Sequence, residues 1–436
     1  MSVVEESEYR RVKGVRTLSF SSFVNKFEKR IVEEEVSYEM DVTKEALKDL
    51  EEPVYFPNFP GGALMINLWG TRERVGKALN VDRSQIVDLL AQAVEKPEPV
   101  EILDDAPILD NVVTDFDLRD LPIPKYYPGD GGRYITSGVV FSEYDGDRNL
   151  SFHRMMLTGK DTFTIRLVPR HLNKMYEKAK ENGEELKISI AIGLCPSILL
   201  AGATSVDYHV GEFEIASALR KKGRGERVQA VKLEDGALVP AYTEYIFQGR
   251  ITHEEGDEGP FVDITGTYDK VRKQPVVKID TIYHKDDPIF HALLPGGYEH
   301  FLLMGLPRES VMKSEVGKIT DVKDVRLTEG GCSWLHGIIS VNKSSDNEVK
   351  EAIKKAFEAH TSMKKVIIVD DDIDIFDDRE VEWAVATRFQ PHKDLVILED
   401  QKGSSLDPSA PNLTSKWGLD ATKPWDGEEF TKAKVE

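Results

Sequence analysis

The order of strand-like and helical segments constrains the fold of this 436-residue chain more than any other feature. Between about residues 106 and 290, runs rich in β-branched and aromatic residues are separated by turn residues, and helical segments interrupt them at 171–183 and 211–223. Many strands in one block favour a barrel or a sandwich. The strand-like runs are YITSGVVFSEY, FTIRLV, LKISIAIG, VQAVKL, YTEYIFQGRI and VVKIDTIYH.

A different pattern follows a predicted helix at 297–315. Strand-like and helical segments now alternate, which predicts a second α/β domain with parallel strands. They are SWLHGIISV (333–341), a helix over 346–360, KKVIIVDD (364–371), a helix over 379–388, and LVILED (395–400). The polar, turn-rich tail after residue 401 is expected to wrap over a neighbour or to fray.

The first hundred residues read as a small α/β unit. Helical spacing of apolar residues covers 20–30, and ALMINLWG (63–70) is a buried-strand candidate. A second helix is predicted over 82–96, where Asp82 and Gln85 occupy capping-box positions. Prolines in KPEPVEILDDAP then break the pattern, so we expect a boundary near residue 105.

The predicted fold class is therefore α/β (α+β), and the length suits two or three domains. We divide the chain into an N-terminal α/β unit, a strand-rich central unit, a linker helix, and a C-terminal α/β unit with its tail. Their boundaries are 1–105, 106–295, 296–315 and 316–436.

Charge and cysteine content limit the partners. Lys and Arg total 57 and Asp and Glu total 77, so the net charge is −20. Such a surface argues against nucleic acid and anionic membranes, and a phosphate ligand would need a local basic cluster or a cation. No apolar run is long enough for a membrane span, and the polar start lacks the apolar region of a signal peptide. With only Cys195 and Cys332, we expect a cytoplasmic protein whose metal, if any, uses O and N ligands.

Several polar residues lie where strands or helices begin and end. Arg154 and His171 follow strands, where such residues are usually surface or structural ones, and the helix dipole alone explains Glu212 in a first turn. Together, Asn149, His171 and Glu212 can supply O and N donors to Mg²⁺ or Mn²⁺. Such a cation would let an acidic protein hold a phosphate.

The stretch EGPFVDITG (258–266) places Glu258 and Asp263 around a Gly-Pro corner. The plain interpretation is a solvated turn followed by a strand. The alternative is that the two carboxylates flank Arg154, which keeps one of them ionised while burial and like-charge repulsion raise the pKa of the other. A carboxylic acid prepared in this way can donate a proton near neutral pH.

These motifs, in this order, resemble the UbiD family of decarboxylases that use prenylated flavin mononucleotide, over nearly the whole chain. EGPF followed by an acid, and DDDID followed by REVEWAVATR, are specific. The matching stretches are INLWGTRERV (66–75), NLSFHR (149–154), the spacing from His171 to Glu212, EGPFVDITG, EGGCSWLHGIISV (329–341), VDDDIDIFDDREVEWAVATRF (369–389) and SKWGLDATKPW (415–425).

The resemblance implies a role for each site residue. Arg154, Glu258 and Asp263 correspond to the family's acid–Arg–acid network, with Asp263 as proton donor. Asn149 and Glu212 match ligands of a metal that holds the flavin phosphate, and His171 falls where some members place a third ligand. The implied cofactor-binding residues are Phe152, His153, Arg154, Arg166, Leu167, Val168, Arg170 and His171.

The implied fold is a central split β-barrel that binds prenylated FMN and a C-terminal domain that forms a homo-oligomer, at least a dimer. The implied activity is non-oxidative decarboxylation of an α,β-unsaturated or aromatic acid. The resemblance also implies Mn²⁺ or Mg²⁺, with K⁺ as a further option, and a flavin prenyltransferase that supplies the cofactor. No Walker or dinucleotide glycine fingerprint is present, which agrees with a cofactor held by metal and strands.

The chain is short for the family and resembles its compact archaeal members, which implies anhydromevalonate phosphate as substrate and isopentenyl phosphate as product, as in the archaeal mevalonate pathway. For the substrate phosphate, Arg133 and Arg170 are candidates, although a surface role suits each equally well. The alternatives are an aromatic acid such as 4-hydroxy-3-polyprenylbenzoate and, in a different class, a flavin-binding module without catalysis. Mere binding would not require the set of Arg154, Glu258 and Asp263.

Overall fold

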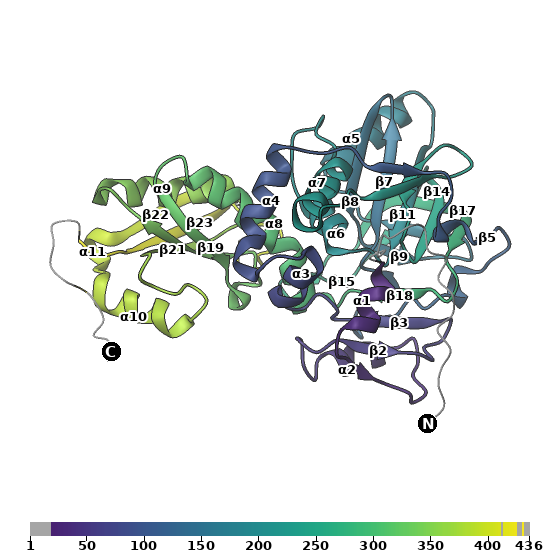
Figure 1. Cartoon of the computed structure of the whole chain (residues 1–436), viewed down its shortest axis with the longest axis horizontal. Helices are drawn as coiled ribbons and strands as arrows, with labels where there is room; N and C mark the ends of the chain where they lie inside the picture. Colours follow the sequence, from purple (N-terminus) through teal and green to yellow (C-terminus); the bar gives the residue numbers. More distant parts are fainter. Residues whose placement is uncertain (1–18, 411–412, 425–429, 431–436) are drawn as a thin grey trace.

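The computed structural model describes residues 19–410, 413–424 and 430. The predicted lack of a signal peptide concerns residues 1–18 and lies outside this part of the chain. The predicted mixed α/β fold class is confirmed. Figure 1 shows two lobes, one built from the N-terminal and central elements and one from the C-terminal elements, with α8 (Tyr298–Val316) at their junction.

The N-terminal sheet has the strand order β1-β2-β3-β18. Its strands are β1 (Arg30–Ile31), β2 (Val54–Phe56), β3 (Ala63–Ile66) and β18 (Ile289–Ala292). The last of these comes from far along the chain and pairs in parallel with β3. The helices of this part are α1 (Phe20–Lys26), α2 (Asp41–Ala46), α3 (Arg72–Leu79) and α4 (Ile86–Glu95). The predicted capping box of Asp82 and Gln85 is confirmed at the 3₁₀ turn that leads into α4.

Antiparallel strands build the central sheet in the order β6-β9-β10-β17-β14-β11-β7-β8, and β5 pairs with β17. The strands are β5 (Asn111–Val113), β6 (Tyr134–Ile135), β7 (Val139–Tyr144), β8 (Asp147–Phe152), β9 (Met155–Leu157), β10 (Thr162–Ile165), β11 (Leu186–Ile192), β14 (Tyr245–Glu258) and β17 (Arg272–His284). Smaller sheets contain β4 (Glu101–Leu103), β12 (Gln229–Lys232) and β13 (Leu238–Pro240), and β15 (Phe261–Val262) with β16 (Tyr268–Asp269).

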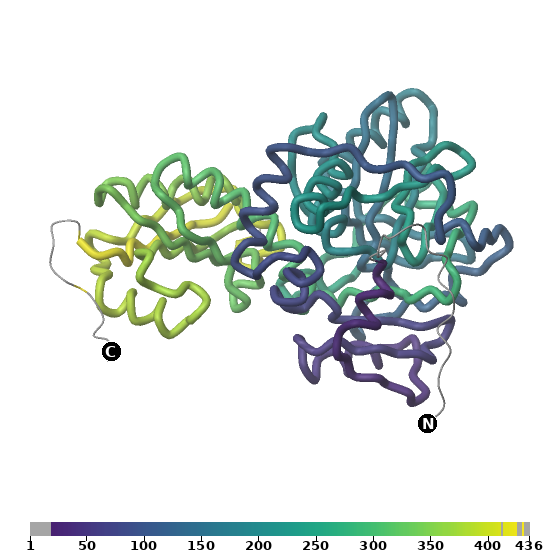
Figure 2. Tube along the Cα trace, in the orientation of Figure 1, coloured from purple at the N-terminus to yellow at the C-terminus, as the bar shows by residue number. Residues whose placement is uncertain are grey.

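Apolar clusters cover both faces of the central sheet. Successive side chains of a strand point to opposite faces, so neighbouring residues of one strand belong to different clusters. Val139 and Phe141 belong to one apolar cluster and Val140, between them, to another. The first cluster includes residues of α6 (Pro196–Ala203) and α7 (Glu212–Arg224), and the second includes residues of α5 (His171–Glu181). Figure 2 traces the path of the chain through these strands and helices.

The C-terminal sheet has the order β19-β20-β21-β23-β22. Its elements are β19 (Asp321–Leu327), β20 (His336–Asn342), α9 (Asp346–Ala359), β21 (Lys365–Asp370), α10 (Asp378–Arg388), α11 (Pro391–Asp394), β22 (Leu395–Lys402) and β23 (Leu413–Ala421). The predicted parallel pairing is confirmed for β20 with β21. It is wrong for β22, which lies at the edge and runs antiparallel to β23.

For residues 413–421 the prediction that the tail wraps over a neighbour or frays is wrong, because β23 lies inside this sheet, parallel to β21. Residues 411–412, 425–429 and 431–436 of the tail lie outside the described part of the chain. Leu419 packs toward α10, while Gly418 lies so close to α9 that an added Cβ would be 2.3 Å from Ile353. The tail thus completes the core between the two helices. Within the described ranges, we find no helix that combines the length and apolar character of a membrane span.

Candidate active site

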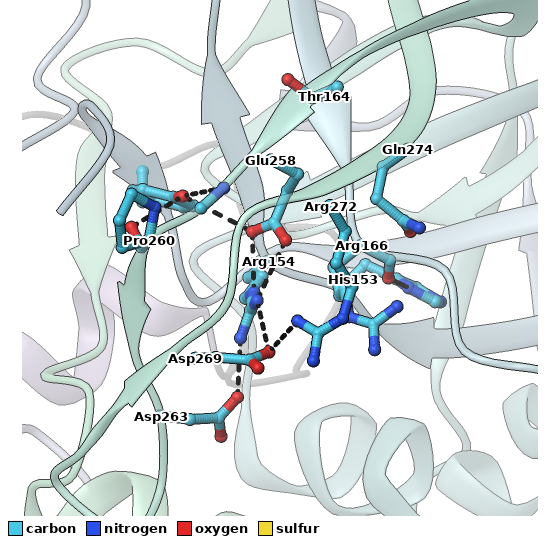
Figure 3. A network of polar contacts seen from close by, with 12 residues as sticks. His153, Arg154, Thr164, Arg166, Glu258, Pro260, Asp263, Asp269, Arg272 and Gln274 are labelled. Atoms are coloured by element: carbon cyan, nitrogen blue, oxygen red, sulfur yellow. Dashed lines mark hydrogen bonds and ion pairs between the residues drawn. The ribbon is translucent and has the colours of Figure 1, made fainter. Parts of the chain in front are cut away.

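Three strand ends bring the predicted catalytic residues together. Arg154 follows β8, Glu258 ends β14, and Asp263 follows β15. Figure 3 shows that both carboxylates point toward the Arg154 guanidinium. The two acids lie 104 and 109 residues away from Arg154 in the sequence, so only the folded sheet brings the three into contact.

The Arg154 guanidinium is held by three carboxylates. Its Nε and Nη2 donate to the two oxygens of Glu258 at 2.8 and 3.0 Å, which makes this pair bidentate. Its Nη1 donates to Asp263 at 2.7 Å, and Nη2 also donates to Asp269 at 2.9 Å. The guanidinium carbon lies 4.7 Å from the centre of the Phe261 ring. Three acids therefore hold the edges of this cation, and Phe261 covers one of its faces.

Exposure distinguishes the acids. The Glu258 side chain is fully buried and that of Asp269 is 9% exposed, whereas 19% of the Asp263 side chain is exposed. Burial lowers the pKa of Arg154, but its hydrogen bonds and ion pairs with the acids outweigh burial and raise it. Burial likewise opposes ionisation of Asp269, yet Arg272 and Arg154 lower its pKa to about 2. Asp263 is the most exposed acid of this set.

The Gly-Pro corner fixes where Glu258 points. Gly259 has φ +98°, and a Cβ there would meet the Lys270 carbonyl at 2.8 Å, so the position requires glycine. Its N–H donates to the Tyr134 hydroxyl at 3.1 Å. The peptide bond between Gly259 and Pro260 is cis. The sequence EGPF is therefore a tight connection between β14 and β15.

The three candidate metal ligands also lie together. The Asn149 amide donates to Glu212 Oε1 at 3.2 Å, and His171 Nδ1 lies 3.5 Å from the same oxygen. Burial raises the pKa of the Glu212 carboxyl to about 7, and burial also lowers the pKa of His171. Asn149 and Glu212 line a cavity of about 300 Å³. We find no group of three or more His, Cys, Asp or Glu side chains with metal-binding geometry in the described residues, so a metal here depends on the Asn149 amide.

The donors around Asn149 fit a cation. Burial lowers the pKa of His153 to about 4, so this ring is neutral at pH 7. Its Nδ1–H donates to the Arg166 carbonyl, which leaves Nε2 as an acceptor 2.9 Å from the Ser151 hydroxyl. The same hydroxyl lies 2.8 Å from Asn149 Oδ1. Two acceptors therefore share one proton, and a cation on Asn149 Oδ1 would leave that proton to His153.

The predicted cofactor-binding residues of 166–168 lie beside this network. Arg166 N–H donates to the Arg154 carbonyl at 3.1 Å, and Leu167 is buried. Burial, followed by Arg272 and Arg154, lowers the pKa of the Arg166 guanidinium. Val168, three residues after the end of β10, is 37% exposed. An apolar face next to cations suits an aromatic ring that carries a phosphate. Phe152 is half-buried at the end of β8.

The two arginines considered for a substrate phosphate differ. Arg133 donates to the carbonyls of Ile123, Arg119 and Leu121, and it lies 3.5 Å from the Tyr38 ring centre. Its guanidinium is thus engaged in holding a loop. Arg170 instead donates to the Ser205 hydroxyl at 3.0 Å and stays exposed.

Sequence reasoning missed two residues of the Arg154 site. Asp269 pairs with Arg154 because β16 lies against β15, with Asp269 directly opposite Phe261. His300, in the first turn of α8, accepts a hydrogen bond on Nδ1 from the Gly296 N–H at 3.2 Å. Burial lowers the His300 pKa, and Asp263 and Arg154 both act on it electrostatically. The only sequence signal was that each is a polar residue near a Gly-rich turn.

Family models match most of the chain. The model described as "3-octaprenyl-4-hydroxybenzoate carboxy-lyase N-terminal domain" matches residues 27–94, the "Rift-related domain" of the same carboxy-lyase matches 101–298, and its "C-terminal domain" matches 301–421. These are the UbiD_N, UbiD and UbiD_C models.

Curated relatives and solved structures agree with these models. Anhydromevalonate phosphate decarboxylase of Methanosarcina mazei is 44% identical over 89% of this chain and 92% of its own length, and that of Methanocaldococcus jannaschii is 44% identical over 88% and 92%. The UbiD-class enzyme HmfF from Pelotomaculum thermopropionicum in complex with FMN has a TM-score of 0.91 at 34% identity, covering 96% and 97% of the two chains. An evolved dimeric form of HmfF in complex with prFMN has a TM-score of 0.88 at 33% identity, covering 95% and 97%.

Proposed function

The chain belongs to the UbiD family of decarboxylases, and on this premise we propose that it converts anhydromevalonate phosphate to isopentenyl phosphate with prenylated FMN. The reaction removes the carboxylate as CO₂ and places a proton on the same carbon. The observation that carries the proposal is the buried Arg154 guanidinium, held by Glu258, Asp263 and Asp269.

Two acids of the chain have different roles in this reaction: one supplies the proton, and the other holds the Arg154 guanidinium in place. Asp263 is the proton donor, since it is the more exposed member of the predicted acid pair. Glu258 fixes Arg154 through two hydrogen bonds, so the Arg154 Nη1 stays directed at Asp263. A carboxylic acid in this position protonates the carbon that has lost CO₂.

Prenylated FMN, when bound, supplies the acceptor for the electrons of the breaking carbon–carboxylate bond. We propose that Asn149, Glu212 and His171 hold a Mn²⁺ or Mg²⁺ ion that neutralises the flavin phosphate, with K⁺ as a further option. The shared Ser151 proton and the buried Glu212 carboxyl support a cation at this place. Phe152, His153, Arg154, Arg166, Leu167 and Val168 would border the flavin ring.

The choice of substrate rests on the relatives. Archaeal proteins named anhydromevalonate phosphate decarboxylase share 39 to 44% identity with this chain. A gallate decarboxylase of Lactiplantibacillus plantarum shares 32%, which keeps an aromatic acid as the second candidate. A flavin-binding module without catalysis is disfavoured, because binding alone gives no reason to bury Arg154 among three acids.

The test is co-expression with a flavin prenyltransferase, which we propose as the partner that supplies the cofactor. The visible spectrum and mass of the bound flavin would identify it. The loaded protein would then be assayed for CO₂ release from anhydromevalonate phosphate and from 4-hydroxy-3-polyprenylbenzoate. Release from the aromatic acid alone would reject the preferred substrate, and release from neither would favour the binding module.

We further propose the predicted division at 1–105, 106–295, 296–315 and 316–436. The limits of the family models, at 94/101 and 298/301, support the boundaries near 105 and 295, whereas the C-terminal model includes most of the segment 296–315. We also propose a homo-oligomer that forms through the C-terminal domain, supported by the dimeric form of HmfF. A cytoplasmic location fits the two free cysteines, Cys195 and Cys332.

A further inference from the structure

Two arginines from different parts of the chain meet at one hydroxyl group. Arg170 is the N-cap residue of α5, and its Nη1 donates to the Ser205 Oγ at 3.0 Å. Arg308 lies in α8, and its Nη2 donates to the same oxygen at 2.7 Å. Ser205 follows α6 in the central unit. The cluster of Arg170, Ser205 and Arg308 is therefore built where α8 crosses the central unit.

The positive charge of this cluster is not compensated. Throughout the described ranges, neither guanidinium forms an ion pair with a carboxylate, and the buried Arg308 Nε has no hydrogen-bond partner. Burial, followed by Arg170, lowers the pKa of Arg308 to about 10. Two neighbouring cations without an acid are unusual in a chain of net charge −20.

Two buried arginines of this protein pair with acids, whereas Arg308 is half-buried and Arg170 is exposed. Arg72 pairs with Glu309, and Arg388 pairs with Asp370. In these two cases the chain itself supplies a carboxylate to the buried guanidinium, whereas the Arg133 guanidinium is satisfied by three backbone carbonyls. Leaving a polar or charged group unpaired costs stability. The buried Nε of Arg308 has neither kind of partner among the described residues, and together with the neighbouring Arg170 it points to an anion that comes from outside the chain.

The C-terminal unit closes the far side of the cluster. The Arg308 guanidinium carbon lies 5.6 Å from the centre of the Trp334 ring, and the His360 ring packs edge-on against Trp334 at 4.7 Å. Burial, followed by Arg308, lowers the pKa of His360 to about 3, so His360 stays neutral. Trp334 holds the Arg308 side chain in place without neutralising its charge.

We propose that Arg170, Ser205 and Arg308 form a binding site for a phosphomonoester dianion. Two guanidinium groups and one hydroxyl present several N–H and O–H donors to one point, which suits a group with three terminal oxygens. The inference rests on the proposed function, in which both the cofactor and the substrate carry a phosphomonoester. In this site Arg308, and not Arg133, is the second arginine beside Arg170, because the Arg133 guanidinium already donates to three carbonyls.

The experiment compares wild type with Arg170→Gln, Arg308→Gln and the conservative Arg308→Lys. Arg379→Gln is the matched control, since Arg379 is exposed and makes no ion pair in the described residues. Cofactor-free protein is titrated with FMN and with riboflavin, which lacks the phosphate. Loaded enzyme is assayed for KM and kcat, and for inhibition by inorganic phosphate.

If the site holds the cofactor's phosphate, each Gln variant binds FMN about 10- to 100-fold more weakly while riboflavin binding is unchanged. If it holds the substrate's phosphate, FMN binding is unchanged, KM rises and inorganic phosphate inhibits less, each about 10- to 100-fold, while kcat changes by less than about threefold. In both cases the affinity of Arg308→Lys for the phosphate-bearing ligand lies between that of wild type and that of Arg308→Gln.

The proposal is overturned if FMN binding, KM and phosphate inhibition in both Gln variants stay within about twofold of Arg379→Gln. Loss of binding through misfolding can be recognised by denaturant unfolding of the cofactor-free protein. Removing one of two cations that lack an acid should leave this protein as stable as wild type or more stable. A Gln variant that unfolds at lower denaturant than the control would also overturn it. If wild type decarboxylates neither substrate, the proposed function fails, but the FMN and riboflavin titrations still test this site.

Discussion

Replacing Asp263 by Asn should abolish proton donation and leave the structure around Arg154 unchanged. Asp263 makes one hydrogen bond to Arg154, and its side chain is 19% exposed. Asn keeps the size and the acceptor oxygen, so we expect a loss of only about 1 kcal/mol in the free energy of unfolding. Turnover should fall by about 10²- to 10⁴-fold, which is the usual value of a general acid.

Replacing Glu258 by Gln in the same corner is the matched comparison. Glu258 is fully buried and makes two hydrogen bonds to Arg154. Breaking a buried pair by neutralising one partner costs about 3 to 5 kcal/mol. This variant should therefore lose stability as well as turnover, because Arg154 is no longer held in place, and it should disturb flavin maturation.

The assay measures CO₂ release in a single turnover and, on the same preparations, unfolding in urea. Mass spectrometry of the bound flavin reports whether each variant carries the mature cofactor, which we expect for Asp263→Asn and expect to be incomplete for Glu258→Gln. Turnover by Asp263→Asn within tenfold of wild type would refute the proton-donor role and return EGPFVDITG to a structural turn. Equal stability losses in the two variants would refute the division of labour between the two acids.

Three further outcomes follow from the structure. Glu212→Gln should lower metal and flavin content in parallel, as measured by elemental analysis and absorbance; full flavin without metal would contradict the bridging role. The pKa of His360 is about 3 in the folded protein, whereas an unfolded histidine has a pKa of about 6.5. As the pH falls through this interval the unfolded chain is protonated first, so the protein loses stability between pH 6.5 and 3. By pH 4 this loss amounts to about 3 kcal/mol, which His360→Gln should abolish and the exposed control His253→Gln should not. Light scattering should report at least twice the 49.1 kDa of one chain, and a single-chain mass at micromolar concentration would reject the oligomer.

Local patterns in the sequence were sufficient for much of the fold. The helices α5, α7 and α9 begin within one residue of their predicted starts. These segments have clear periodicity and clear boundaries, so propensity and tertiary packing agree. In β23, alternation is obscured because Lys416 is almost fully buried, with its ammonium donating to the Thr361 carbonyl, and Gly418 offers no side chain.

The site was less accessible to local reasoning. The grouping of Arg154 with Glu258 and Asp263 came mainly from the family resemblance, since the contacts span more than 100 residues. Arg308 was missed because it lies inside α8, where a charged residue looks like an ordinary surface position. Its meaning depends on having no acidic partner, and an unpaired charge is visible only after folding. The roles of the metal and cofactor residues remain predictions.

The position of Asp263 depends on parts of the chain far from the central sheet. Its neighbour Ile264 packs with Phe301 of α8 and with Trp334 of the C-terminal unit in one apolar cluster. The N–H of Ile264 donates to Asp263 Oδ1 at 2.7 Å, so a shift of this residue moves the carboxylate directly. Trp334 also lies against Arg308. The contact between the two lobes therefore links the proton donor to the proposed phosphate site, because Trp334 shares a cluster with Ile264, which hydrogen-bonds Asp263, and also lies against Arg308.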